Sequence, residues 1–415
     1  LARLMEYAGR SMRTEEFVNY FTYDYNAPEG DDLFGVKTSV VPCPWNADAK
    51  LLRIGLKVKD VSEVKANNLV FLIDVSGSMS SSDKLPLVKK SFEYLTENLT
   101  EKDTVSIVTY SGHEAVVLDG CAGNQTSKIL DAVNSLEASG STNGEAGLVK
   151  AYETAAKYKS DGVNSRIIMV SDGDLNVGMT SAEELKNFVC EKREEGIYLS
   201  VMGFGTGNYK DSKMEALADN GNGVYYYIDG ESEAKKVFGT DVLATLYTVA
   251  KDVKFQITFN TDAVKAYRLI GYENRLLNNE DFLDDTKDAG EVGSGHTLTV
   301  LYEVKFRDGF DASTFEGGSA TLAVNAKIPG GTESVLREYE IKKEAFSDTP
   351  DDDMRFIESV VKLSMVFHKS IYLTDGKPYD AVDLVGEIYS DLLEQNLTDT
   401  YKIEFRNLVG RLIDK

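Results

Sequence analysis

The spacing of apolar residues changes along the chain, and each change marks a different kind of structure. In the middle of the chain, short continuous apolar runs alternate with amphipathic stretches, which is typical of a parallel sheet covered by helices on both faces. Buried strands are expected at residues 70–73, 105–108, 166–170, 198–202 and 224–228, and helices near residues 83–99, 127–137, 145–158, 181–195, 211–219 and 231–250. The pattern predicts a doubly wound, Rossmann-like α/β domain.

Both flanks of this region show strand patterns of another kind. Residues 51–59 alternate apolar and polar side chains from Leu52 to Val58, at the two-residue period of a half-buried strand. Similar runs follow at residues 253–259, 264–270, 298–306, 320–328 and 334–341. They favour antiparallel sheet. Because the two flanks share this style, we expect one β-sandwich into which the α/β domain is inserted; two separate small β units are the alternative.

Helical periodicity marks both ends of the chain. Residues 13–22 predict a short helix with Thr14 as its cap. Apolar residues recur at three- and four-residue steps after residue 352, behind an acidic run, and further helices are expected at 378–395 and 400–413. The predicted domains are 1–65, with a helix and β-strands; 66–251, the α/β domain; 252–345, the remaining sandwich strands; and 346–415, a small C-terminal helical region.

Composition excludes several classes of partner. The chain has 415 residues, which suits two or three domains, and its 45 basic against 68 acidic residues give a net charge of −23. Such a charge repels phosphate backbones and anionic lipid, so neither nucleic acid nor direct membrane binding is expected. No apolar run reaches the roughly 20 residues of a membrane helix. The three cysteines are too few and too widely spaced for a disulfide framework.

The candidate chemistry lies directly after the first buried strand. Asp74, Ser76 and Ser78 place one carboxylate and two hydroxyls on a tight loop, and ligands of doubly wound sheets bind at the carboxyl ends of strands. Hard divalent cations prefer oxygen ligands, and Mg²⁺ accepts few carboxylates. Two further loops, 140–144 and 171–174, end at the same predicted edge and offer the oxygens that would complete the shell.

This arrangement resembles the metal-ion-dependent adhesion site (MIDAS) of von Willebrand factor type A (vWA) domains. The resemblance rests on Asp74-x-Ser76-x-Ser78 followed in order by Thr142 and Asp172. It implies that the serines and the threonine bind a metal directly, that the two aspartates hold it mainly through water, and that a ligand carboxylate or water takes the sixth position. The implied ion is Mg²⁺, with Mn²⁺ or Ca²⁺ as alternatives.

Segments outside the α/β region are similar to those of the bacterial YfbK-like proteins. These are TEEFVNYF at 14–21, PWN at 44–46, YRLIGYENR at 267–275 and DDTKDAGE at 284–291. The resemblance implies a vWA domain between dedicated N- and C-terminal regions and an extracytoplasmic or cell-surface setting in a bacterium, with a cytoplasmic one as the alternative. The chain starts at Leu1, so we expect a trimmed start that would have removed any signal or lipid anchor.

The predicted function is metal-dependent binding of a protein ligand that presents a carboxylate, and not catalysis. The competing interpretation of the serines is that they merely cap the next helix. Asp174 is interpreted as a solvated loop acid, and Trp45 as a residue that fills the core. Two functional alternatives stay open. One is a phosphatase-like or other metal-dependent hydrolase, although Ser76 stands where such enzymes need a second acid; the other is a scaffold with a purely structural metal.

Overall fold

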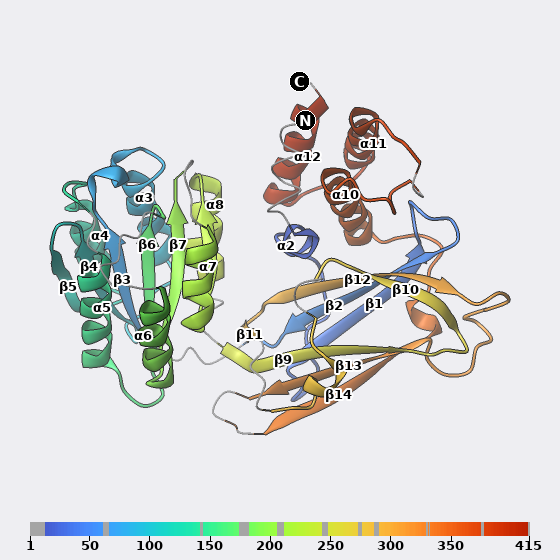
Figure 1. The fold of residues 1–415 in the computed structure, drawn as a ribbon, viewed down its shortest axis with the longest axis horizontal. Coiled ribbons are helices and arrows are strands. Elements are labelled where there is room, and N and C mark those ends of the chain that lie inside the picture. Colours follow the sequence, from blue (N-terminus) through green and yellow to red (C-terminus); the bar gives the residue numbers. More distant parts are fainter. Residues whose placement is uncertain are drawn as a thin grey trace. The chain divides into compact units, whose positions relative to one another are not determined.

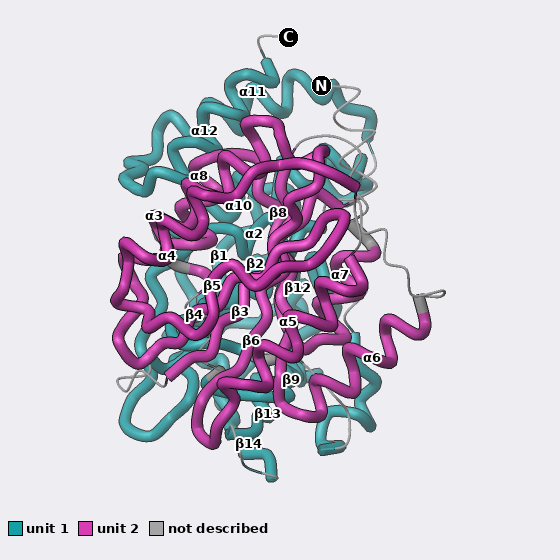
Figure 2. The backbone as a smooth tube through the Cα atoms, turned by 90° about the vertical axis from the view of Figure 1, so that its left-hand side faces the viewer, with its two compact units in different colours: residues 1–60, 249–415 teal, residues 61–248 magenta. Residues whose placement is uncertain are grey.

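The computed structural model describes residues 13–60, 66–141, 144–173, 182–205, 211–242, 248–272, 276–285, 290–328, 331, 333–374 and 377–413. The chain forms two compact units. One combines Leu1–Asp60 with Val249–Lys415, and the other is Val61–Thr248. Figure 2 shows the first in teal and the second in magenta. The flanking segments thus belong to one unit, and the α/β region is inserted between them.

The unit of residues 61–248 is a six-stranded sheet with helices on both faces (Figure 1). Its order is β5-β4-β3-β6-β7-β8, in which β5 runs antiparallel to β4 and every other pair is parallel. The predicted doubly wound fold is confirmed. The strands are β3 Asn67–Asp74, β4 Thr104–Tyr110, β5 Glu114–Ala122, β6 Asn164–Ser171, β7 Ile197–Phe204 and β8 Tyr225–Ile228.

Burial on both faces explains the continuous apolar runs. In β3, Leu69, Phe71 and Ile73 join one core with helices α3 Leu85–Thr96, α4 Thr126–Asn134 and α8 Glu231–Lys236. The alternate residues Val70 and Leu72 join a second core with α5 Gly144–Tyr158, α6 Ala182–Glu194 and α7 Asp211–Asn220. Since neighbouring side chains point to opposite faces of a strand, every position of β3 must be apolar or hydrogen-bonded.

Two features of this unit differ from the prediction. Strand β5 was missed by the prediction. It lies at the edge of the sheet, so its short apolar run at residues 115–118 is not buried, and Val116 and Val117 are exposed. The helix expected at 231–250 is too long. Its described residues comprise α8 and a π-helical turn, Val237–Asp241, and strand β9 already begins at Thr248, where β-branched residues favour extended backbone.

The other unit contains two four-stranded antiparallel sheets, ordered β1-β2-β12-β10 and β11-β9-β13-β14. Aromatic contacts join the two sheets. The ring centroids of Phe259 in β9 and Tyr302 in β12 are 5.4 Å apart, and those of Phe34 in β1 and Phe255 in β9 are 6.4 Å apart. The predicted sandwich is therefore present. Its strands are β1 Phe34–Pro42, β2 Lys50–Val58, β9 Thr248–Phe259, β10 Val264–Ile270, β11 Gly290–Gly293, β12 Thr297–Phe306, β13 Ala320–Lys327 and β14 Ser334–Ile341.

Strand β2 is buried on both faces, which corrects the half-buried prediction. Ile54 and Leu56 face the second sheet, beside Phe255. The opposite face carries Leu51, which packs against the terminal helices α2 Thr14–Asn19, α10 Asp352–Phe367, α11 Ala381–Leu393 and α12 Thr400–Ile413. The helices cover a face that an isolated sandwich would expose to water. The polar residue Arg53 on this face of β2 is therefore also buried.

The expected cap of α2 is wrong. Thr14 is the first helical residue, and the preceding Arg13 makes no side-chain cap. The Thr14 hydroxyl instead lies 2.8 Å from the Ser364 hydroxyl of α10 and shares a hydrogen bond with it. A tertiary partner thus takes the oxygen that would otherwise accept from the helix backbone.

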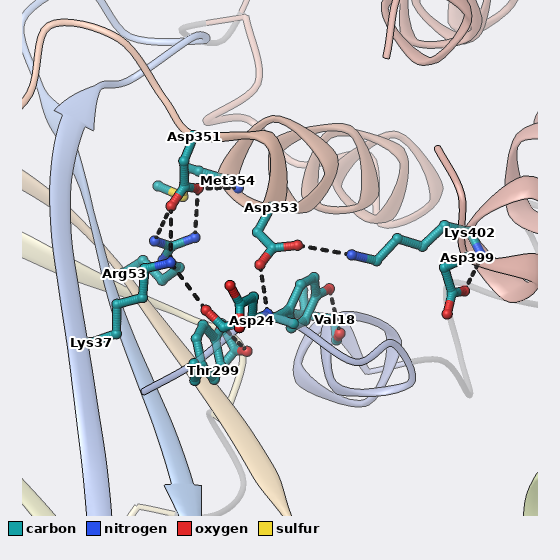
Figure 3. A network of polar contacts seen from close by, with 12 residues as sticks. Val18, Asp24, Lys37, Arg53, Thr299, Asp351, Asp353, Met354, Asp399 and Lys402 are labelled. Atoms are coloured by element: carbon teal, nitrogen blue, oxygen red, sulfur yellow. Dashed lines mark hydrogen bonds and ion pairs between the residues drawn. The ribbon is translucent and has the colours of Figure 1, made fainter. Parts of the chain in front are cut away.

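A buried charge fixes the start of α10 on the sheet (Figure 3). Arg53 of β2 is fully buried and donates to both Asp351 carboxylate oxygens, at 2.9 and 2.8 Å. Asp351 also caps α10 by accepting the Met354 amide at 2.8 Å. Burial acts to raise the pKa of Asp351, but the hydrogen bonds and charge of Arg53 outweigh it and bring the pKa to about 2. Asp353, two residues along, accepts from Lys402 of α12 at 2.9 Å.

We expect Asp351→Asn to lower the free energy of unfolding by about 2–3 kcal/mol at neutral pH, because it keeps a good cap but leaves the Arg53 charge buried and uncompensated. The pKa of Asp351 is lowered from 3.8, so the ion pair contributes fully above pH 3.8 and is lost as the pH falls through about 2. Urea unfolding at several pH values measures this difference. The neighbouring variant Asp352→Asn is the control, and equal losses in both variants would contradict the role of Arg53.

Candidate metal centre

Three of the predicted oxygen ligands lie on one turn at the end of β3. Asp74 is fully buried, and its Oδ1 accepts the Ser76 amide at 2.8 Å. The hydroxyl oxygens of Ser76 and Ser78 lie 3.0 Å apart. The turn continues as a short 3₁₀ helix, Gly77–Ser80, in which Met79 is fully buried in the core. Met79 therefore anchors the turn that presents the two hydroxyls.

Burial destabilises the charged form of the Asp74 carboxylate. Burial raises its pKa to about 6, although hydrogen bonds from Ser76 lower it; the nearby Asp172 carboxylate raises it further. Its Oδ2 is buried and makes no hydrogen bond of good geometry with the described residues, although the buried Tyr110 hydroxyl is near enough to lower the pKa of Asp74. An orphaned carboxylate oxygen costs free energy. The residues present thus fit a hard divalent cation, which binds carboxylate and hydroxyl oxygens and would satisfy this atom.

Asp172 approaches the same turn from the neighbouring strand. It follows β6, which pairs with β3, and its side chain is 4% exposed. Lys84 donates to Asp172 Oδ2 at 2.9 Å and to the Ser78 carbonyl at 3.0 Å. Asp172 and the Asp74 turn are thus brought together, with a lysine ammonium between them. Sequence reasoning missed Lys84; its position just ahead of α3 was the only available signal.

Thr142 and Asp174 lie outside the described residues. The structure therefore describes the predicted loop 140–144 on its N-terminal side only up to residue 141. The Ser139 amide donates to the Val75 carbonyl at 2.8 Å, and the Gly77 amide donates to the Gly140 carbonyl at 3.1 Å. The backbone that leads to Thr142 therefore runs beside the Asp74 turn. Within the described ranges no cluster of three or more His, Cys, Asp or Glu residues could hold a metal. The candidate centre instead combines two carboxylates with hydroxyl groups.

Known families match along most of the chain. Residues 244–412 match the family described as "Uncharacterized protein YfbK, C-terminal", residues 68–240 match the von Willebrand factor type A domain, and residues 5–53 match a family described as von Willebrand factor. "Uncharacterized protein YfbK" of Escherichia coli is 39% identical over 388 residues, which cover 88% of this chain and 67% of that protein. The chain belongs to the YfbK family.

More distant relatives of this YfbK-family protein share mainly the vWA region. Human inter-alpha-trypsin inhibitor heavy chain H3 is 27% identical over 179 residues, which are 41% of this chain and 20% of that protein. The solved structure of a von Willebrand factor type A protein from Catenulispora acidiphila is similar over 90% of this chain and 88% of that chain, with a TM-score of 0.48 and 15% sequence identity. The vWA and YfbK resemblances are confirmed. Domains of the vWA class commonly mediate protein–protein interactions and often use a divalent metal. Within the described ranges, no helix has the length and apolarity of a membrane span.

In the presence of chelator, Asp74→Asn is expected to raise the unfolding temperature of the YfbK-family protein. The amide keeps an acceptor for the Ser76 amide but removes the charge that burial penalises. Differential scanning calorimetry at pH 8 measures the change, and Asp131→Asn on the exposed surface of α4 is the control. An unfolding temperature below that of the parent protein would contradict the interpretation of Asp74 as a residue held at a cost for binding.

Proposed function

We propose that the vWA domain binds a divalent cation through Asp74, Ser76, Ser78, Thr142 and Asp172, and that the bound cation captures a carboxylate of a protein partner. Mg²⁺ is the proposed ion, with Mn²⁺ or Ca²⁺ as alternatives. The observation that carries the proposal is the buried, orphaned Oδ2 of Asp74 beside the paired hydroxyls of Ser76 and Ser78. A buried carboxylate whose hydrogen bonding is incomplete is stabilised by a cation more than by any neutral group.

The residues of the candidate centre differ in their exposure to solvent. Asp74 and Ser76 are buried and shaped by the core, whereas Ser78 is exposed to solvent. A cation at this turn would be held from below by buried oxygens and be reached by a ligand from the solvent side. The cation would supply the positive charge for an acidic group, and hydrogen bonds around the rim would supply specificity.

We propose binding and not hydrolysis as the activity. A hydrolase with an aspartate nucleophile needs a second acid two residues along to move a proton, and this chain has Ser76 there. Ser76 is also committed to its neighbour, because its hydroxyl lies within hydrogen-bond distance of Ser78. An experiment distinguishes metal-dependent binding from the scaffold alternative. If the metal is purely structural, chelation lowers the thermal stability of the protein but leaves partner binding intact.

The domain boundaries and the location are also proposals. We propose domains at 1–65, 66–251, 252–345 and 346–415. The division of the chain into compact units at residues 60/61 and 248/249 supports the first two of these boundaries. We propose an extracytoplasmic or cell-surface location. The adhesive use of vWA domains and the resemblance to bacterial YfbK-like proteins support it, and no nucleic-acid partner fits the net charge of −23.

Calorimetric titration with Mg²⁺ or Mn²⁺ tests the metal centre. We expect the parent protein to bind one ion, Asp74→Ala to abolish binding, and Ser78→Ala to weaken it roughly tenfold or more, as loss of a direct oxygen ligand implies. Ser80→Ala is the matched control, since Ser80 is an exposed serine at the end of the same turn. Partner capture by the immobilised protein is then compared in Mg²⁺ and in chelator. Capture that chelator leaves unchanged would contradict the metal-dependent mechanism.

A further inference from the structure

Lys84 places a positive charge inside the proposed metal centre. Its ammonium donates to the Asp172 carboxylate and to the Ser78 carbonyl, so one side chain bridges two of the loops that would hold the metal. The pair is not an ordinary surface ion pair, because the Asp172 side chain is 4% exposed and that of Lys84 is 21% exposed. Solvent screens such a partly buried pair less than it screens an exposed one.

The fold holds the Lys84 side chain in this position. Its backbone carbonyl accepts the Val88 amide at 2.8 Å as the first hydrogen bond of α3. Its aliphatic stem lies against Gly205, directly after β7, where a Cβ would come within 2.7 Å of Lys84 Cε. Gly205 has a φ of +101°, a conformation that glycine adopts without strain. Segments that follow β3, β6 and β7 therefore all contact the same lysine.

We propose that Lys84 is a built-in cation that binds Asp172 in the absence of metal and competes with the divalent metal for this carboxylate. This inference rests on the proposed metal binding. Without metal, Lys84 neutralises Asp172 and ties its loop to the Ser78 turn. When metal binds, the ammonium gives up Asp172, because two cations that share one carboxylate repel each other at this range. Lys84 thus lowers metal affinity while it keeps the unloaded site assembled.

Two uncharged substitutions test the proposal in the full chain. Lys84→Met keeps the length of the stem, and Lys84→Gln keeps a polar end. Each is expected to bind Mn²⁺ roughly tenfold more tightly than the parent protein in calorimetric titration, since a nearby like charge is removed. Each is also expected to unfold at a lower temperature in chelator, where the Ser78–Asp172 bridge is lost. Lys90→Met is the matched control, because Lys90 lies on α3, which begins directly after Lys84, but pairs with the exposed Glu93.

The outcomes separate this inference from the proposed function. Tighter Mn²⁺ binding by both Lys84 variants but not by Lys90→Met supports the competition, and so does binding by the variants when the parent protein binds nothing. If the parent protein binds Mn²⁺ and the Lys84 variants bind it equally or more weakly, the competition is overturned and the metal centre stands. If no protein in the series binds Mn²⁺ or Mg²⁺, the proposed function itself fails and the inference fails with it.

Discussion

The arrangement of the candidate centre depends on the parallel pairing of β3 with β6. Parallel neighbours end at the same edge of a sheet, so a residue at the end of one strand lies beside the residue at the end of the next. Asp74 ends β3 and Asp172 follows β6, and their carboxylates are close enough for the charge of Asp172 to raise the pKa of Asp74. Two like charges are thus brought close together by backbone topology. The Lys84 ammonium compensates that of Asp172.

The β-sandwich unit also contains a nearly buried carboxylate, Glu303, on which donors from several segments converge. Glu303 of β12 accepts from Trp45 at 3.1 Å, from Asn46 at 2.6 Å and from Arg268 at 2.6 Å. These donors come from two of the segments that resemble YfbK-like proteins, PWN and YRLIGYENR. Trp45 also packs against the helical core. The family-like segments outside the vWA domain therefore meet at one nearly buried carboxylate, which gives them a role in joining strands.

Periodicity predicted most of the fold because burial decides which residues a strand can carry. The run Val70 to Ile73 must be apolar on both faces, and strands such as β10 and β14 were located to the residue. Positions governed by contacts distant in sequence were missed. Thr14 bonds to Ser364, and β2 is covered by helices from the far end of the chain. Likewise, the motif identified the candidate ligands, but Lys84 became part of the site only through its three-dimensional neighbours.

The inserted arrangement imposes an order on the assembly of the protein. Strand β2 pairs with β12 from Lys57 opposite Thr297 onward, so the sandwich needs residues separated by the whole α/β insertion. The described strands of the insertion, between Asn67 and Ile228, pair only with one another. Contacts that are distant in sequence form slowly, and domains complete first during synthesis when their own strands are already available. On the ribosome, the vWA domain is therefore able to fold while β2 still lacks its sheet partner β12.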